Sequence, residues 1–408
     1  MIDSLPRPRG SALRFAMALS PVILFVLTFG AFAKGGGDGP SVPAARPPVA
    51  LPPRSGDALP DESGSVDREL AMLQRSTSAA DRLDLDAQRA VRRGLEYLRS
   101  TQNDDGSWTD KIGRKVHFDY RGSLGKHVGV TALACMAFLA NGSLPGRGEY
   151  GEQIERGLDF ILKQVQHNGF ITHQESRMYS HAFATLFLAE VYGMTGMESV
   201  GTKLKQSISL IVEAQNPNGG WRYQPGAPDA DMSITVCQVM ALRAANNAGI
   251  HVPKSVIDRA IDYVKNSYNH RNGAFNYQIE DGPGGQRQMT RYSFALTAAG
   301  VTALYGAGVY DDAHIEAGLG YLNQNLFSFS RAPEGRFDYY YGMYYGTQAA
   351  FQAGGDYWEH WHGKVWSDLL RLQHPNGYWR DLVGRNYGTA MACVILQIPY
   401  QYLPIFER

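Results

Sequence analysis

The chain has 408 residues, and its 39 basic and 39 acidic side chains cancel to a net charge of zero. A neutral chain has no long-range electrostatic attraction for polyanions, so we expect no nucleic-acid partner. Three cysteines are too few for a disulfide framework, and no Cys/His cluster has the spacing of a zinc site. We therefore expect no metal and no cofactor.

The N-terminal residues have the layout of a secretory signal. Three arginines precede a charge-free apolar run, residues 15–33, that ends in the tripeptide Ala-Phe-Ala. A basic start, an apolar stretch and a small-residue cleavage site predict a signal peptide over residues 1–33 and export of the chain, secreted or periplasmic. The run approaches the shortest length of a membrane span, so an uncleaved N-terminal anchor is the alternative, and the one expected contact with a membrane.

Residues 34–85 are expected to form a linker and an N-terminal extension. The stretch from 34 to 66 is rich in proline and glycine and contains almost no large apolar side chains. Such a segment buries too little apolar surface to offset the entropy lost on ordering. We expect a disordered tether.

From residue 86 onward the same pattern recurs six times: an amphipathic helix, a glycine-containing turn, and a helix that is almost free of charge. The amphipathic helices are expected at 86–102, 149–166, 197–215, 253–268, 312–325 and 357–373. The apolar helices are expected at 126–140, 179–192, 231–248, 290–305, 341–353 and 387–400.

This alternation predicts two concentric layers, with the amphipathic helices outside and the apolar helices inside. The six pairs average about 54 residues each, which is in the range of helical repeats. An open array needs a polar helix at each end, yet the last inner helix is as apolar as the others. We therefore predict an all-α fold over residues 86–408, a closed (α/α)6 toroid.

A loop motif follows several outer helices. Residues 93–108 resemble the QW repeat of squalene–hopene cyclases at every defined position, and the third and sixth repeats keep its second half. The second repeat is degenerate, and the fourth and fifth keep the helical part alone. The motif residues are Gln102, Gly106 and Trp108, then Gln215, Gly219 and Trp221, then Gln373, Gly377 and Trp379.

The resemblance identifies the superfamily of α/α toroids that contains terpenoid cyclases, protein prenyltransferase β-subunits and complement thioester domains. The motif itself has a structural interpretation. Glutamine can bond free carbonyls at a helix end, glycine allows the left-handed turn, and tryptophan packs over the neighbouring outer helix. We expect these residues to stabilise the ring rather than to contact a ligand.

The strongest catalytic candidates are Asp229 and Asp231, at the start of the third inner helix. Asp229-Ala-Asp-Met resembles the DxDD motif of class II terpene cyclases, whose middle aspartate protonates an alkene or epoxide. Asp231 matches that middle residue, and Met232 departs from the last aspartate. The alternative is that one of these aspartates caps the helix.

Several other polar and aromatic residues near inner-helix starts could line a central cavity. Aromatic ring faces suit an apolar or cationic guest, but the same side chains could simply pack the interior. Histidines there could bond a carboxylate or be satisfied core residues. These cavity-lining candidates are His127, His181, Tyr292, Tyr341, Tyr344 and Tyr387.

Other activities of the superfamily are disfavoured. A prenyltransferase-type zinc needs Asp and Cys close together, whereas Asp231 and Cys237 are six residues apart and fall on different helix faces. The thioester signature is absent. The leading hypothesis is an exported toroid that binds an apolar, isoprenoid-like small molecule or a protein partner through its cavity or rim. The alternatives are a terpenoid-cyclase-like enzyme with Asp231 as acid, and a structural envelope protein.

Overall fold

The computed structural model describes residues 79–113, 121–281, 287–331, 333 and 336–407. The expected signal peptide, residues 1–33, and most of the expected linker lie outside this part of the chain. The first described helix, α2 (Ala79–Ser100), begins inside the range predicted to be linker. One reason is the bond between Asp84 Oδ1 and His362 Nε2, 2.8 Å apart, which holds the first turns of α2 against a later helix.

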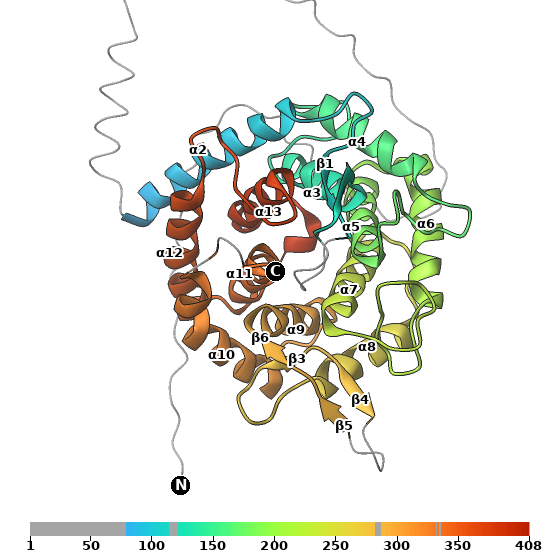
Figure 1. Cartoon of the computed structure of the whole chain (residues 1–408), viewed down its shortest axis with the longest axis vertical. Coiled ribbons are helices and arrows are strands. Elements are labelled where there is room, and N and C mark those ends of the chain that lie inside the picture. The colour runs from blue at the N-terminus through green and yellow to red at the C-terminus, as the bar shows by residue number, and fades with distance from the viewer. Residues whose placement is uncertain (1–78, 114–120, 282–286, 332, 334–335, 408) are drawn as a thin grey trace, which may run out of the picture. The chain divides into compact units, whose positions relative to one another are not determined.

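The twelve α-helices of the described residues form two concentric rings (Figure 1). The outer ring consists of α2, α4 (Gly151–Lys163), α6 (Glu198–Glu213), α8 (Lys254–Asn266), α10 (Ala313–Ser330) and α12 (Gly355–Leu372). The inner ring consists of α3 (Val128–Leu139), α5 (Met178–Thr195), α7 (Met232–Asn247), α9 (Phe294–Gly306), α11 (Tyr339–Ala353) and α13 (Arg385–Gln397).

The inner ring is closed. Each inner helix packs against the next one along the chain, and α13 packs against α3. The burial pattern explains the two layers: every residue of α3 is buried, whereas α4 buries one face and exposes the other. The predicted (α/α)6 toroid, with the apolar helices inside, is confirmed.

Three short antiparallel ribbons interrupt the loops, and the sequence pattern did not predict them. They pair β1 (Thr109–Ile112) with β2 (Ser123–Lys126), β3 (Phe275–Asn276) with β6 (Tyr292–Ser293), and β4 (Ile279–Asp281) with β5 (Arg287–Met289). Because β6 pairs with β3, α9 begins later than the predicted residue 290.

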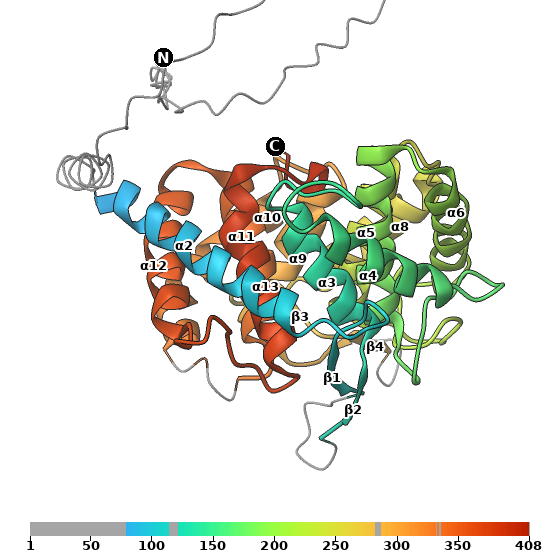
Figure 2. The ribbon, with the colours of Figure 1, turned by 90° about the horizontal axis from the view of Figure 1, so that it is seen from above.

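The inner helices all begin at one face of the ring, which we call the near face, and end at the opposite, far face. The strands lie at the near face (Figure 2). The chain ends at the far face with two short 3-10 helices, η2 (Ile398–Tyr400) and η3 (Pro404–Phe406). Within the described residues, no helix combines the length and the apolar character needed to cross a bilayer.

One set of contacts, which we call the Gln–Gly–Trp staple, ties a loop to two outer helices. In the last repeat, Gln373 Nε2 donates to the carbonyl oxygens of Gly377, at 2.9 Å, and of Ala90, at 2.8 Å. Trp379 Nε1 donates to the carbonyl oxygen of Leu369 at 2.7 Å. Since Ala90 lies in α2, this staple joins the last repeat to the first and closes the ring.

The same donors and acceptors recur in two further repeats. Gln102 bonds Gly106 and a carbonyl of α4, and Gln215 bonds Gly219 and a carbonyl of α8. The indoles of Trp108 and Trp221 each donate to the carbonyl ten residues earlier, at 2.8 and 2.7 Å. All three staple tryptophans are buried.

We expect the turn glycine of the closing staple to tolerate no side chain. Gly377 has φ +87°, and a Cβ there would lie 2.5 Å from the carbonyl oxygen of Arg93 in α2, whereas Gly308 has φ +84° with no atom within 4 Å of a Cβ. Gly308→Ala should cost about 1–2 kcal/mol of unfolding free energy from the left-handed backbone. Gly377→Ala should cost roughly 1–3 kcal/mol more through the clash. If the two variants lose equal unfolding free energy in urea denaturation, the role of Gly377 in closing the ring is contradicted.

Candidate functional site

Three inner helices begin with the same side-chain cap. His127, Asp231 and Ser293 each accept a hydrogen bond from the backbone amide three residues later, at 3.3, 3.0 and 3.2 Å. Burial lowers the pKa of His127 to about 4, so its Nδ1 is available as an acceptor at neutral pH. The candidate acid therefore occupies the position at which two other repeats carry a helix cap.

Asp231 is fully buried and surrounded by donors. Its Oδ1 accepts from Ser233 Oγ at 2.5 Å as well as from the helix amide, and its Oδ2 accepts from Arg222 Nη1 at 2.8 Å. Burial raises the pKa of Asp231, while the hydroxyl, the amide and the guanidinium oppose that rise. Because all three partners donate hydrogen, the geometry suits a carboxylate rather than an acid aimed at a guest.

Arg222 organises the near face beside Asp231. Its Nε lies 3.0 Å from Oδ2 of Asp229, a half-exposed side chain, and its Nη1 donates to the Tyr277 hydroxyl at 3.1 Å. The guanidinium also lies 4.8 Å from the centre of the Tyr223 ring. Both sequence-predicted aspartates thus share one cation. Nothing in the sequence singled out Arg222, because it simply follows the staple Trp221.

Four tyrosines next to this ion pair form what we call the tyrosine floor: Tyr179, Tyr223, Tyr277 and Tyr341. Tyr179 donates to Ser233 Oγ at 2.6 Å, and Tyr341 donates to the Ser233 carbonyl at 3.0 Å. The hydroxyls of Tyr223 and Tyr277 are 2.6 Å apart. All four side chains are partly exposed, so the floor presents aromatic surface with fixed hydroxyls at the near face.

The floor is positioned by backbone bonds to the helix starts. The carbonyl of Tyr223 accepts from the amide of Met178, the first residue of α5, at 3.1 Å. The carbonyl of Tyr277 accepts from the amide of Met232, the first residue of α7, at 2.8 Å. Each loop therefore lies across the start of an inner helix, and its tyrosine lies beside the first residue of that helix.

Aromatic side chains meet across the lumen of the inner ring. Helices α5 and α11 stand opposite each other, three places apart in the ring of six. The rings of Tyr179 and Tyr341 are nevertheless 6.4 Å apart, and those of Phe183 and Tyr344 are 6.2 Å apart. Tyr344 is fully buried. The lumen is therefore bridged at the tyrosine floor by Tyr179 and Tyr341, and beyond it by Phe183 and Tyr344.

The other predicted cavity residues have different surroundings. His181 Nδ1 accepts from the Ile171 amide at 3.1 Å, the role that threonine hydroxyls fill for the corresponding loops of other repeats, and burial lowers the pKa of His181 to about 3. Tyr292 is 49% exposed and packs on Tyr321 of the outer helix α10, outside the lumen. Tyr387 is partly exposed at the start of α13, 6.5 Å from the ring of Tyr340.

The described residues contain no group of three or more His, Cys, Asp or Glu side chains that could hold a metal ion. Cys237 lies in the inner ring with its Sγ 3.2 Å from the Tyr345 hydroxyl. Burial raises the pKa of Cys237 to about 12, which keeps it a neutral thiol. It acts as a small core residue.

Comparison with known proteins identifies the fold. A model of the squalene-hopene cyclase C-terminal domain matches residues 74–194. The type II terpene cyclase MstE from Scytonema, in its apo form, superposes with a TM-score of 0.53 at 17% identity, over 78% of this chain and 99% of that chain. A variant of that cyclase bound to geranylgeranyl dihydroxybenzoate gives 0.52 at 14% identity, over 79% and 99%.

An unsaturated glucuronyl hydrolase specific for heparin is similar to the same degree, with a TM-score of 0.55 at 13% identity over 78% of this chain and 96% of that chain. No curated protein sequence gives a significant match. The family model over residues 74–194 confirms the expected resemblance to the prenyltransferase/squalene-cyclase repeat superfamily. At these identities the structures establish the fold, which proteins of different chemistry share.

We expect Asp231→Asn to destabilise the protein. Asparagine keeps a capping oxygen, but its amide would direct hydrogens toward Arg222, which costs about 1–3 kcal/mol. Asp231→Ala should cost about 1 kcal/mol more through loss of the cap. Asp229→Asn, at the exposed end of the same ion pair, is the matched control and should change stability by about 0.5 kcal/mol or less. If Asp231→Asn and Asp229→Asn have the same melting temperature, the ion pair between Arg222 and Asp231 contributes little to stability.

Proposed function

We propose that this protein binds a ligand on the tyrosine floor of the near face and does not cyclise a polyprenoid within the ring. One observation supports this most directly: Tyr179 and Phe183 of α5 meet Tyr341 and Tyr344 of α11 across the lumen. A long apolar chain enclosed in the lumen would have to displace these rings. A guest resting on the floor needs no such rearrangement.

The chemistry of the floor favours an apolar guest. Burial raises the pKa of Tyr179 and Tyr341 well above 10, so both remain neutral phenols at physiological pH. Their ring faces attract apolar groups and cations. Arg222 is balanced by two carboxylates and so gives no preference for an anion. The expected ligand is an isoprenoid-like small molecule, or an apolar segment of a protein partner, and a cationic end group is compatible.

A binding experiment with two probes tests this function. Farnesol and dodecyltrimethylammonium should each bind the purified protein with one site per chain in isothermal titration calorimetry. Tyr341→Ala removes part of the floor and should weaken binding by about tenfold or more. The matched control is Tyr292→Ala, which removes a tyrosine that packs on the outer ring. Equal affinities for the two variants, or no binding of either probe to the wild type, would contradict the proposal.

A second candidate function is an acid-initiated terpenoid cyclase with Asp231 as proton donor. Its support is the match of Asp231 to the middle aspartate of DxDD, the toroid fold, and the burial that raises the pKa of Asp231. Two features oppose it: the donors around the carboxylate and the rings that bridge the lumen.

Incubation with squalene or geranylgeranyl diphosphate, followed by mass spectrometry of the products, separates the two functions. Our proposal predicts no cyclised product. Cyclised product from the wild type but not from folded Asp231→Asn would establish the cyclase instead, because asparagine cannot deliver a proton. Asp229→Asn would serve as the folded control in the same assay.

We also propose that the chain is exported, on the basis of the signal-like layout of residues 1–33. The N-terminal sequence of the mature protein, isolated from a bacterial host that expresses the full chain, should begin at Lys34. An intact Met1 in a membrane fraction would instead indicate an anchor.

A further inference from the structure

After η2, the chain turns back into the centre of the ring at the far face (Figure 1). We call residues 401–407 the plug segment. It includes η3, which packs against α5 and α7 of the inner ring. Its apolar side chains Leu403, Ile405 and Phe406 are 0%, 2% and 2% exposed. The plug segment therefore occupies the far end of the lumen with three buried apolar side chains.

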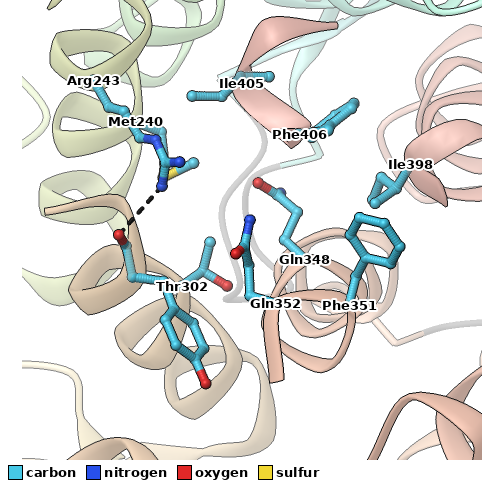
Figure 3. A pocket seen from close by; sticks show the side chains of 10 residues that line it. Met240, Arg243, Thr302, Gln348, Phe351, Gln352, Ile398, Ile405 and Phe406 are labelled. Atoms are coloured by element: carbon cyan, nitrogen blue, oxygen red, sulfur yellow. Dashed lines mark hydrogen bonds between the residues drawn. The ribbon is translucent and has the colours of Figure 1, made fainter. Parts of the chain in front are cut away.

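The plug segment reaches the aromatic side chains that bridge the lumen. The ring of Phe406 lies 6.4 Å from that of Tyr344, which in turn contacts Phe183. Between the plug segment and helices α7, α9 and α11 a cavity of about 10 Å³ remains, with Ile405 and Phe406 on one side and Met240 and Gln348 on the other (Figure 3). Such a space holds one water at most. The fit is close.

Few polar contacts anchor this segment to the ring. The amide of Ile405 donates to Glu190 Oε2 at a long 3.4 Å, and Gln352 Nε2 donates to the carbonyl of Glu407 at 3.1 Å. The segment begins at Gln401, whose φ of +53° is a left-handed conformation that non-glycine residues rarely adopt. A left-handed residue at its start and mainly apolar contacts distinguish this segment from the hydrogen-bonded helices of the ring.

Glu190 is a buried carboxyl group directly under the plug segment, 2% exposed. Burial raises its pKa to about 8 against the hydrogen bond from the Ile405 amide, which lowers it; the nearby charge of Glu407 adds to the rise, and Arg243 of α7 opposes it. Tyr344 of α11 also faces it. Glu190 is thus neutral at pH 7 while the segment covers it, and ionisation would leave a buried charge beside the carboxylate of Glu407.

We propose that the far end of the lumen is a binding site for short apolar peptides, and that the plug segment is its exchangeable occupant. The ligand class is a short segment of the Leu-Pro-Ile-Phe kind, with two or three large apolar side chains and a backbone amide that donates to Glu190. This site is on the opposite face from the tyrosine floor and does not depend on the function proposed there.

A shortened variant that ends at Gln401 tests the site directly. At pH 6 it should bind the synthetic peptide Tyr-Leu-Pro-Ile-Phe-Glu, one per chain, in isothermal titration calorimetry. The matched control peptide replaces Ile405 and Phe406 by serine and should bind at least about tenfold more weakly, because burial of those side chains is lost. Equal binding of both peptides, or no binding to the folded variant, would overturn the proposal.

The pH dependence of peptide affinity tests whether the peptide backbone binds Glu190. We expect the burial that a bound peptide adds to raise the pKa of Glu190 more than the amide of Ile405 lowers it. Affinity is then greatest below the pKa of the empty site and falls as pH rises toward about 8. We expect binding about tenfold weaker at pH 8.5 than at pH 6, equivalent to one pKa unit. Glu190→Gln should remove this dependence and keep binding to the peptide. A pH dependence that persists in Glu190→Gln would exclude the assigned contact.

Hydrogen exchange on the full chain keeps the proposal testable if the shortened variant does not fold. The amides of Ile405 and Phe406 should exchange through local opening, with far smaller protection factors than the amides of the inner helices. Their protection should fall between pH 6 and pH 8.5 in the wild type and stay constant in Glu190→Gln. Exchange of these amides by global unfolding alone would show that the segment is a permanent part of the core, and would refute the proposal.

Discussion

The closed ring depends on the contact between its last and first repeats, to which helix packing and one glutamine side chain both contribute. Gln373 donates one amide hydrogen to the loop of the last repeat and another to a carbonyl of α2, in the first repeat. Arg93 of α2 completes the contact by donating to the glutamine oxygen. A ring has no free ends to fray, so this bond, together with the packing of α13 on α3 and of α12 and α13 on α2, holds the inner helices that form the near face. Where the same staple ends at Trp221, the next residue is Arg222, whose place beside Asp231 follows from the loop geometry.

At the near face the Asp231 carboxylate is held firmly by hydrogen bonds, which leaves it poorly suited to donate a proton. Asp231 caps α7 as His127 caps α3, and its second oxygen is held by Arg222. A proton donor to an alkene needs an acidic hydrogen directed at an apolar cavity. Here the carboxylate faces three donors, and aromatic rings from opposite helices bridge the space below it. The same features suit a recognition surface, because phenol rings held by hydrogen bonds lose little entropy when a guest binds.

The fold was largely predictable, whereas the site was predictable only in part. Burial of whole helices appears in the sequence as runs without charge, so the two layers followed from the alternation of helix types, and closure followed from the apolar character of the last inner helix. The strand pairs did not, because two-residue strands such as Tyr292–Ser293 have no periodicity to detect. The cap at Asp231 was one of two predicted roles, but the partner Arg222 was missed, since an ion pair across a loop leaves no trace in residue spacing. Tyr292 was expected in the lumen as part of an inner helix, but it lies in β6 and packs on Tyr321 of the outer ring.

The ionisation state of Asp231 distinguishes a helix-capping carboxylate from a proton-donating acid. Carbon-13 NMR of the protein labelled at aspartate carboxyl carbons, with Asp231→Asn used to assign the resonance, measures that state. We predict a carboxylate shift for Asp231 at pH 7, because an amide, a hydroxyl and a guanidinium all donate to its oxygens. A shift typical of a protonated carboxyl group at pH 7 would contradict it, because a stable neutral acid at this position is what the cyclase mechanism requires.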